Sequence, residues 1–487
     1  MRKLLLFLLL TLFSLALAPA SPGQALGPWS EPLLLNDEGA TTPFILADSS
    51  GAVHVFWGST GLTGTKSAIF YRRLADGVWS ETVDILAPPA GSSAIYPSAA
   101  IDEVGTIHLV WVSDKLYYSQ AHLSQALEPR AWSSPYQMTN YAVSDAVIRI
   151  ALDGSLNVLF GSRGSTPAVY LLKSEDGGDF WRVAVQVSMP QGGAYALTCS
   201  LAVDAAGRLH AAWAEALPKA TQGEGAAEIP PSGVYYARSD DGGAHWSYPR
   251  AIAGADQGDP AIGVDAQDRL HIFWSGTGSA AGKYHLYWDP QFGEWSRIER
   301  ILPSGEGLLG PPALALDASG WLHIAIAAAG QPAPGEIITL SWRAGRWGDA
   351  YQPAQSLADA EVEHAQPALA IALGNSLHLV WIAIDLRDVQ QDDSPGYLWY
   401  ASRQLASSPI EALPVPTRVV PPATPTPLVQ PTVVLPTPTP WVVVASGFLP
   451  QTPVWYKVVP IVTGASLTVL VLIVLLRISF RKRTHVR

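Results

Sequence analysis

The histidines of this sequence recur in a line that could hold a metal ion, Asp-x-x-Gly-x-Leu-His-Leu-x-Trp, with Val or Ile often replacing Leu. Six copies carry the histidine: His54, His108, His210, His271, His323 and His378. Imidazole binds transition metals, but one histidine per copy, spread round separate repeats, cannot converge on one ion at ~2.1 Å bonds. We therefore expect no metal and no cofactor, and interpret these histidines as buried, hydrogen-bonded core residues.

Two further sets of charged residues could bind a ligand. Arg149 lies in the apolar stretch Ala146–Ile150. Counting four residues back from the turn aspartate gives its expected equivalents, which are mostly small: Phe44, Ser98, Ser200, Ala261 and Ala313. Such a position suits a crowded central channel, where Arg149 could contact an anion or form an ion pair with Asp145. The long loop from Ile384 to Gly396 contains four aspartates, Asp385, Asp388, Asp392 and Asp393. These aspartates could bind calcium or a basic partner, or the loop could simply be solvated.

These residues lie within a repeat that occurs seven times between about residues 27 and 403, at intervals of 49 to 61 residues. Each copy follows a short apolar stretch and precedes a mostly aromatic strand, a turn and, in six copies, a tryptophan. The turn-rich composition, with 42 Gly, 40 Pro and 18 Trp, suits an all-β fold. Four short strands per repeat predict one blade of a β-propeller. We expect seven blades, with six as the alternative if the weak third copy is irregular.

The two ends of the repeat array predict how the ring closes. Six tryptophans follow a third strand, whereas no tryptophan soon follows the seventh such strand, Leu398–Tyr400. The missing piece stands at the start, where Gly27–Pro32 resembles Trp246–Pro249. We therefore expect the N-terminal strand to complete the last blade, which would pair the exposed edges and tie the termini together.

Two turns share the pattern Ser-x-Asp-x-Gly-x-x-Trp, with Ser174, Asp176, Gly178 and Trp181 in the first and Ser239, Asp241, Gly243 and Trp246 in the second. The Ser and Asp side chains can bond turn amides, Gly supplies a positive φ and Trp packs on the hairpin, so we interpret the pattern as structural. It resembles the Asp-box of the sialidase-like, BNR-repeat propellers, and the resemblance covers about 375 residues.

The resemblance implies that the Asp-boxes lie on the face opposite the active site. For the enzymatic members it also implies three arginines that grip a substrate carboxylate, an Asp acid/base and a Tyr nucleophile activated by a Glu. The first arginine normally lies in an inner strand near the N-terminus, whereas Thr42–Leu46 has none. We therefore expect a binding module for glycans or surface proteins, with an exo-acting glycoside hydrolase of the sialidase type as the alternative. No catalytic residue is assigned, because sequence spacing does not fix the separation of two carboxylates.

The ends of the chain predict a protein of the cell membrane with a single span. Residues 1–20 read as a signal peptide, and residues 458–476 form an uncharged stretch that crosses most of a bilayer. The basic tail, 477–487, would lie in the cytoplasm, and the propeller (27–403) and the Pro/Thr-rich stalk (404–457) outside.

Charge and cysteine content exclude other classes. The formal net charge is −11, and setting aside seven basic residues near the termini leaves about −18 on the rest. A nucleic-acid partner is therefore not expected. The single cysteine, Cys199, excludes an internal disulfide framework.

Overall fold

The computed structural model describes residues 27–37, 39–59, 67–88, 93–164, 167–217, 231–303, 305, 307–330, 333–357, 359, 361–387 and 396–416. The predicted signal peptide, transmembrane segment and basic tail lie outside these residues, as does the predicted stalk beyond Pro416. Within the described part of the chain, no helix is long and apolar enough to cross a membrane.

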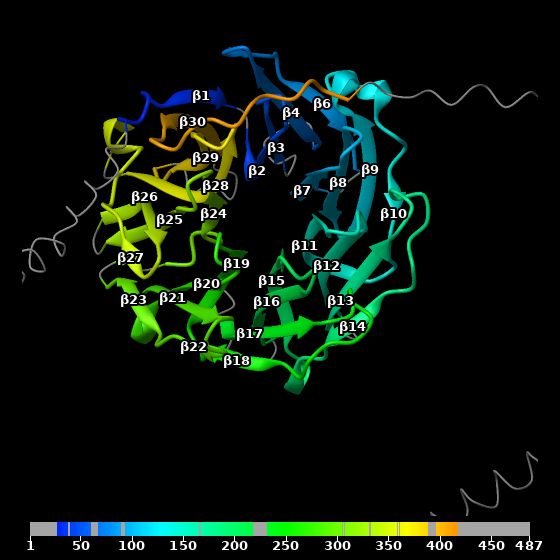
Figure 1. Cartoon of the computed structure of the whole chain (residues 1–487), viewed down its shortest axis with the longest axis vertical. Coiled ribbons are helices and arrows are strands. Elements are labelled where there is room, and N and C mark those ends of the chain that lie inside the picture. Colours follow the sequence, from blue (N-terminus) through cyan, green and yellow to red (C-terminus); the bar gives the residue numbers. More distant parts are fainter. Residues whose placement is uncertain are drawn as a thin grey trace, which may run out of the picture. The chain divides into compact units, whose positions relative to one another are not determined.

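The described chain forms seven antiparallel sheets round a central axis, so it is an all-β, seven-bladed propeller, as predicted (Figure 1). The six-bladed alternative is wrong, because the weak third copy forms a regular blade.

The strands of each blade run from the channel outward. Blade 1 contains β2 (Thr41–Ala47), β3 (Val53–Gly58), β4 (Ile69–Ala75), β5 (Val78–Trp79) and β6 (Val83–Leu86). Blade 2 contains β7 (Ile95–Ile101), β8 (Thr106–Ser113), β9 (Lys115–His122) and β10 (Tyr136–Gln137). Blade 3 contains β11 (Ala142–Ile150), β12 (Leu156–Arg163), β13 (Ala168–Ser174) and β14 (Val185–Ser188). Blade 4 contains β15 (Tyr195–Val203), β16 (Leu209–Ala216), β17 (Pro231–Ser239) and β18 (Arg250–Ala253).

The remaining blades follow the same order. Blade 5 contains β19 (Gln257–Val264), β20 (Leu270–Gly276), β21 (Gly282–Asp289), β22 (Glu294–Trp295) and β23 (Glu299–Leu302). Blade 6 contains β24 (Ala313–Leu316), β25 (Leu322–Gly330), β26 (Ala333–Arg343) and β27 (Arg346–Trp347). Blade 7 contains β28 (Val362–Ala372), β29 (Ser376–Asp385), β30 (Gly396–Gln404) and β1 (Leu33–Asn36). Short 3-10 turns are η2 (Leu123–Gln125), η3 (Pro129–Ala131), η4 (Gln191–Gly193), η6 (Gly278–Ala280) and η7 (Gln355–Leu357).

The N-terminal strand closes the ring. β1 pairs with β30, with Leu33 opposite Tyr400, and Trp29 forms a bridge to Arg403. The Arg403 guanidinium donates to the Gly27 carbonyl at 2.6 Å and lies over the Trp29 ring at 5.8 Å. The predicted closure is confirmed.

The recurring histidines join the turns to the third strands inside the blades. His54 Nε2 lies 3.1 Å from Asp48 Oδ2, and its Nδ1 lies 2.7 Å from the Tyr71 hydroxyl. The same pair of contacts recurs at His108 and His210. The hydrophobic core lies between neighbouring blades, since each apolar cluster draws on two of them. These histidines are therefore buried, hydrogen-bonded core residues, as the sequence analysis interpreted them.

The ring has two distinct faces. At one face, here called the mouth face, the inner strands begin and the second strands end, as the pairing of Thr41 with Gly58 shows. At the other, here called the Asp-box face, the first strands turn into the second and the third into the fourth. Ile150, Leu156 and Ser174 lie in register there.

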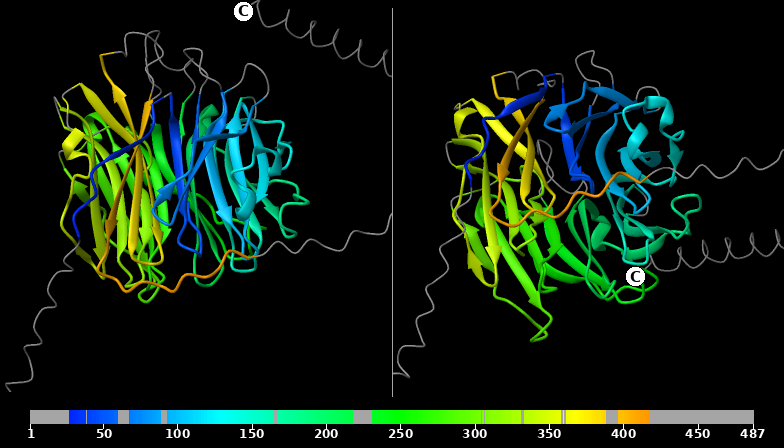
Figure 2. Two further views of the ribbon diagram at one scale, coloured as in Figure 1. Left: turned by 90° about the horizontal axis from the view of Figure 1, so that it is seen from above. Right: turned by 45° about the horizontal axis from the view of Figure 1, so that its top comes forward.

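Residues 405–416, which the sequence analysis assigned to the stalk, run along the Asp-box face, where they are coloured orange in Figure 2. Backbone amides of this segment donate to carbonyls of blades 7 and 1: Leu405 to Asn375 at 2.7 Å, and Leu413 to Ser49 at 2.8 Å. Val415 packs on the core between blades 1 and 2. The first dozen residues after β30 are therefore part of the propeller's surface.

Candidate functional site

The mouth of the channel is lined by one equivalent residue from each blade, here called the mouth ring. The position lies four residues before the inner-strand residue that pairs with the recurring histidine or with Asn157, and all seven residues line a cavity of about 400 Å³. They are Thr42, Tyr96, Asp145, Thr198, Asp259, Pro311 and Gln366.

The mouth ring is built by bulges. The pairing register shifts at this position in six of the seven described inner strands. Thr42, Tyr96, Asp259 and Gln366 each precede a proline and have φ between 47° and 53°. A positive φ is uncommon for residues other than glycine, and the position before proline normally favours extended backbone. Strained positions of this kind cluster at functional sites, so this end of the ring is the first place to seek a ligand.

Hydrogen bonds between blades hold the ring side chains in place. Gln366 Oε1 accepts from the Thr42 amide at 2.7 Å, and Thr42 Oγ1 accepts from the Tyr96 amide at 2.9 Å. Asp145 Oδ2 accepts from the Cys199 amide at 2.7 Å, and Asp259 Oδ2 accepts from the Gly310 amide at 3.1 Å. Each side chain therefore links its blade to the next, which fixes the polar atoms of the mouth before any ligand arrives.

Two carboxyl groups at the mouth are held in a setting that disfavours their charge. Burial raises the pKa of Asp145 to about 7, and the charge of Asp259 adds to the shift. Burial also raises the pKa of Asp259, against the opposing charge of Lys283. Burial, followed by the charges of these two carboxylates, raises the pKa of Tyr96 to about 12. Because both carboxylates act on the Tyr96 hydroxyl, the three groups form one electrostatic cluster.

Arg149 lines the same cavity, as predicted for a channel residue. Its Nη1 donates to the Ile148 carbonyl at 2.8 Å, and burial lowers its pKa to about 10. Among the described residues it forms no ion pair, so the expected pairing with Asp145 is not observed.

The register corrects the equivalence that the sequence analysis gave to Arg149. Arg149 lies opposite Asn157, the residue that replaces the recurring histidine, so its true equivalents are the partners of the other histidines. These are Leu46, Ala100, Ala202, Gly263, Ala315 and Ala370, two residues later than expected. The count failed because Asp153 is not the turn residue equivalent to Asp48. The equivalent of Asp48 is Ala151, because the Gly154 amide donates to the Ala151 carbonyl just as the Gly51 amide donates to the Asp48 carbonyl.

Asp385, the described aspartate of the loop after β29, does not line the cavity with Asp145. Asp385 lies at the end of β29, on the rim of the mouth face, where Arg387 Nε donates to its Oδ1 at 2.8 Å. These hydrogen bonds from Arg387 lower the pKa of Asp385. Asp388, Asp392 and Asp393 lie outside the described residues.

The two Asp-box turns lie on the opposite face and bond as a structural motif would. Ser174 Oγ accepts from the Gly178 amide at 2.9 Å and donates to Asp176, which accepts from the Phe180 amide. The second box repeats these bonds. A Cβ at Gly178 would lie 2.1 Å from the Tyr118 hydroxyl, so glycine is needed for both its φ of 93° and its lack of a side chain.

Sequence reasoning missed most of the mouth ring. Tyr96, Asp259, Gln366 and Thr42 were not singled out, although the signal was present as a residue before proline at the start of several inner strands. Only the pairing register shows that these residues are equivalent and point to one cavity.

Comparison with known proteins supports the fold. No family model matches the sequence, and no curated protein matches it significantly. An ulvan lyase, from a new polysaccharide lyase family, is 10% identical with a TM-score of 0.51, covering 76% of this chain and 95% of its own. A lectin from Burkholderia pseudomallei is 11% identical with a TM-score of 0.51, covering 72% and 96%. The NanB sialidase from Streptococcus pneumoniae is 13% identical with a TM-score of 0.45, covering 80% and 72%.

The seven-bladed ring, with its Asp-box turns on the face opposite the channel mouth, has the fold that the sequence resemblance to the sialidase-like propellers indicated. At these identities the likeness concerns the fold alone. What the chain does must be argued from its own side chains.

Proposed function

We propose that this chain is a glycan-binding propeller whose ligand enters the mouth of the channel. The observation that carries the proposal is the mouth ring, in which seven equivalent positions supply polar and apolar atoms to one cavity of about 400 Å³. A concave site with a few fixed polar groups is the usual form of a small-ligand site. Polysaccharide lyase and lectin functions are known on the same fold, which supports a carbohydrate ligand.

The charges of the mouth favour a neutral or amino-bearing sugar. Asp145 and Asp259 line the cavity, and Arg149 is the one arginine among the described residues that do. A sialic-acid carboxylate is held best by several guanidinium groups, and here it would meet two carboxyls instead. Hydroxyl and amino groups, in contrast, can donate to Asp145, Asp259 and Gln366.

A glycan array probed with the full chain in mild detergent tests the proposal. We expect neutral or amino-bearing glycans to bind above sialylated ones. Tyr96→Ala and Asp145→Asn should each weaken binding at least fivefold, because both residues line the mouth. Glu175→Gln, an exposed change on the Asp-box face, is the control. Binding of sialylated glycans alone that Tyr96→Ala and Asp145→Asn both weaken would contradict the proposal, as would equal binding by all variants.

A second candidate function, exo-acting glycoside hydrolysis, is supported by the carboxyl pair. Asp145, with a pKa raised to about 7, has the character of a general acid, and Asp259 is a second carboxyl in the same cavity. Fluorogenic glycosides, sialylated and neutral, provide the test. We expect no release from the sialoside. Release that is lost in Asp145→Asn or Arg149→Ala would place the protein among the enzymes.

We also propose that the propeller is displayed at a cell surface. The proposal rests on the sequence of residues 1–20 and 458–476. Protease treatment of intact cells that express the chain should release the propeller and leave the basic tail protected. A propeller that resists protease until the cells are lysed would contradict surface display.

A further inference from the structure

A second pocket lies on the Asp-box face, between blades 4 and 5, and is distinct from the mouth. It has a volume of about 220 Å³, and its wall includes three arginines, Arg208, Arg238 and Arg250. Two tryptophans of blade 5, Trp288 and Trp295, line the same space. Two carboxylates, Asp204 and Asp268, line it as well, so the pairing of each arginine decides where positive charge is left over.

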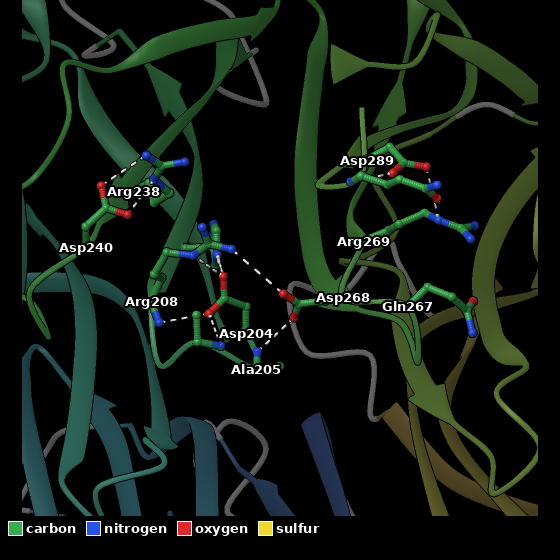
Figure 3. A network of polar contacts seen from close by, with 12 residues as sticks. Asp204, Ala205, Arg208, Arg238, Asp240, Gln267, Asp268, Arg269 and Asp289 are labelled. Carbon is green, nitrogen blue, oxygen red and sulfur yellow. Dashed lines mark hydrogen bonds and ion pairs between the residues drawn. The ribbon is translucent and has the colours of Figure 1, made fainter. Parts of the chain in front are cut away.

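The arginines of this pocket differ in how far their charge is compensated. Arg208 Nε donates to Asp204 Oδ2 at 2.5 Å, and Arg238 Nε lies 2.9 Å from Asp240 Oδ1 (Figure 3). Arg250 is exposed and has no carboxylate partner among the described residues; its guanidinium lies 5.0 Å from the centre of the Trp295 ring. The pocket therefore has a free cationic group beside an aromatic face.

The internal symmetry of the ring shows that the fold does not require these arginines. The three positions are the residue before the second strand, the third-strand partner of the recurring histidine, and the outer-strand residue that faces the third strand two residues before that partner. Blade 1 has one arginine at these positions, Arg73, and blade 5 has one, Arg269. Blades 2, 3, 6 and 7 have no arginine at them, although blade 3 has Lys173 opposite Asn157. Seven blades form with one such cluster, so the cluster serves something other than blade formation.

The neighbouring blade shows what a purely structural arginine looks like here. Arg269 lies 3.3 Å from Asp289 and 3.7 Å from Asp265, and it covers the Trp342 ring at 5.2 Å (Figure 3). The residue equivalent to Arg250 is Glu299 in blade 5, which accepts from Trp347. In that junction the charges are matched within the protein. In the junction of blades 4 and 5, Arg208 is paired with Asp204 and Asp268, and Arg238 with Asp240, which leaves Arg250 without a carboxylate partner among the described residues.

We propose that the pocket between blades 4 and 5 binds one acidic sugar unit, with its carboxylate or sulfate group on Arg238 and Arg250 and its ring against Trp295 and Trp288. Guanidinium groups recognise both oxyanions through charge-assisted hydrogen bonds. The volume is below the ~300–1,000 Å³ of sites for drug-sized ligands, so it suits a single sugar unit. This site is independent of the mouth, and its acidic ligand differs from the neutral or amino-bearing sugar that the mouth favours.

Calorimetric titration of the full chain in mild detergent tests the proposal, with four probes: methyl glucuronide, glucose 6-sulfate, methyl glucoside and inorganic sulfate. We expect the two acidic sugars to bind at least tenfold more tightly than the neutral one. Inorganic sulfate should bind more weakly than glucose 6-sulfate, because it lacks the ring. Equal binding by inorganic sulfate would overturn the assignment to a sugar. Equal binding by methyl glucoside in the Tyr96→Ala variant, whose mouth is impaired, would overturn the role of the arginines.

Variants locate the site. Arg250→Ala is an exposed change that should leave the melting temperature unaltered and weaken acidic-sugar binding at least fivefold. Arg238→Ala should act in the same direction. The matched control is Arg73→Ala, which removes the equivalent of Arg238 from blade 1 and should leave binding within twofold. Asp145→Asn at the mouth should also have no effect. Unchanged binding in both Arg250→Ala and Arg238→Ala, or no binding of either acidic sugar, would overturn the proposal.

Discussion

The two faces of the ring treat buried charge in opposite ways. On the Asp-box face, hydrogen bonds from His54 and Ser50 outweigh the effect of burial and lower the pKa of Asp48 to about 2. At the mouth, burial prevails and raises the pKa of Asp145 to about 7. The first arrangement stabilises the ionised carboxylate through hydrogen bonds within the protein. In the second, the hydrogen bonds do not offset the cost of burying the charged carboxylate. Polar groups left uncompensated at a cavity are candidates for contacts with a ligand.

The largest loss of stability is expected at the buried charge pairs of the Asp-box face. Asp204→Ala removes the acceptor for His210, for Arg208 and for the backbone amides of Ala206 and Arg208. Breaking a buried charge pair costs about 3–5 kcal/mol, which urea unfolding would measure. Asp240→Ala, an exposed control on the same face, should cost less than about 0.5 kcal/mol. Similar losses of unfolding free energy for the two variants would show that the buried network around Asp204 does not stabilise the fold more than an exposed ion pair does.

The mouth should lose stability as the pH rises. The folded pKa of Asp145 is raised to about 7, above its unfolded value of ~3.9, so its stabilising contribution is complete below that unfolded value and declines as the pH rises through the folded pKa. This group alone should cost roughly 2–3 kcal/mol between about pH 5 and pH 8. Asp145→Asn keeps an acceptor for the Cys199 amide and should remove that slope. A variant with the slope of the parent protein would contradict the assignment.

The Asp-box side should lose stability as the pH falls. Burial lowers the pKa of His378 from 6.5 to about 4, so the unfolded chain takes up a proton before the folded one does. The stability contributed by neutral His378 is present above about pH 6.5 and falls by roughly 2 kcal/mol on acidification to about pH 5. His378→Gln should flatten that part of the stability curve. His378 is a suitable probe, because its Nδ1 contacts Tyr400 and its blade has Ala372 where five other blades have the turn aspartate.

The sequence predicted the fold better than the site, for a physical reason. Blade number and closure follow from local signals, such as the repeated turn aspartate and the tryptophan that Gly27–Pro32 supplies to the last blade. The mouth depends on register. A two-residue shift in one repeat hid the true equivalents of Arg149, and bulges bring Asp259 and Tyr96 to one cavity from three blades apart. Pattern alone could place Arg149 in an inner strand, but not gather its neighbours.

The arginine pocket shows the same limit. Arg208, Arg238 and Arg250 stand at unrelated intervals in the sequence, and only strand pairing shows that they occupy three defined positions of one blade. The comparison with Arg73 and Arg269 requires the seven registers together.

The smallest expected effects compare one serine on each face of blade 4. Ser200 Oγ, near the mouth, accepts from the Ile262 amide of blade 5 at 3.1 Å, whereas Ser239 Oγ, in the Asp-box, accepts from the Gly243 amide of its own turn at 2.8 Å. Ser239→Ala leaves a buried amide without an acceptor and should cost about 1–2 kcal/mol, while Ser200→Ala, at a partly buried bond that water can replace, should cost about 0.5–1 kcal/mol. Amide hydrogen exchange separates the two, since Ser200→Ala should speed exchange of Ile262 but not of Gly243, and Ser239→Ala should do the reverse. If Ser200→Ala sped exchange at both amides, the bond between blades would support the whole blade rather than the mouth alone, and the two faces would not be energetically separate.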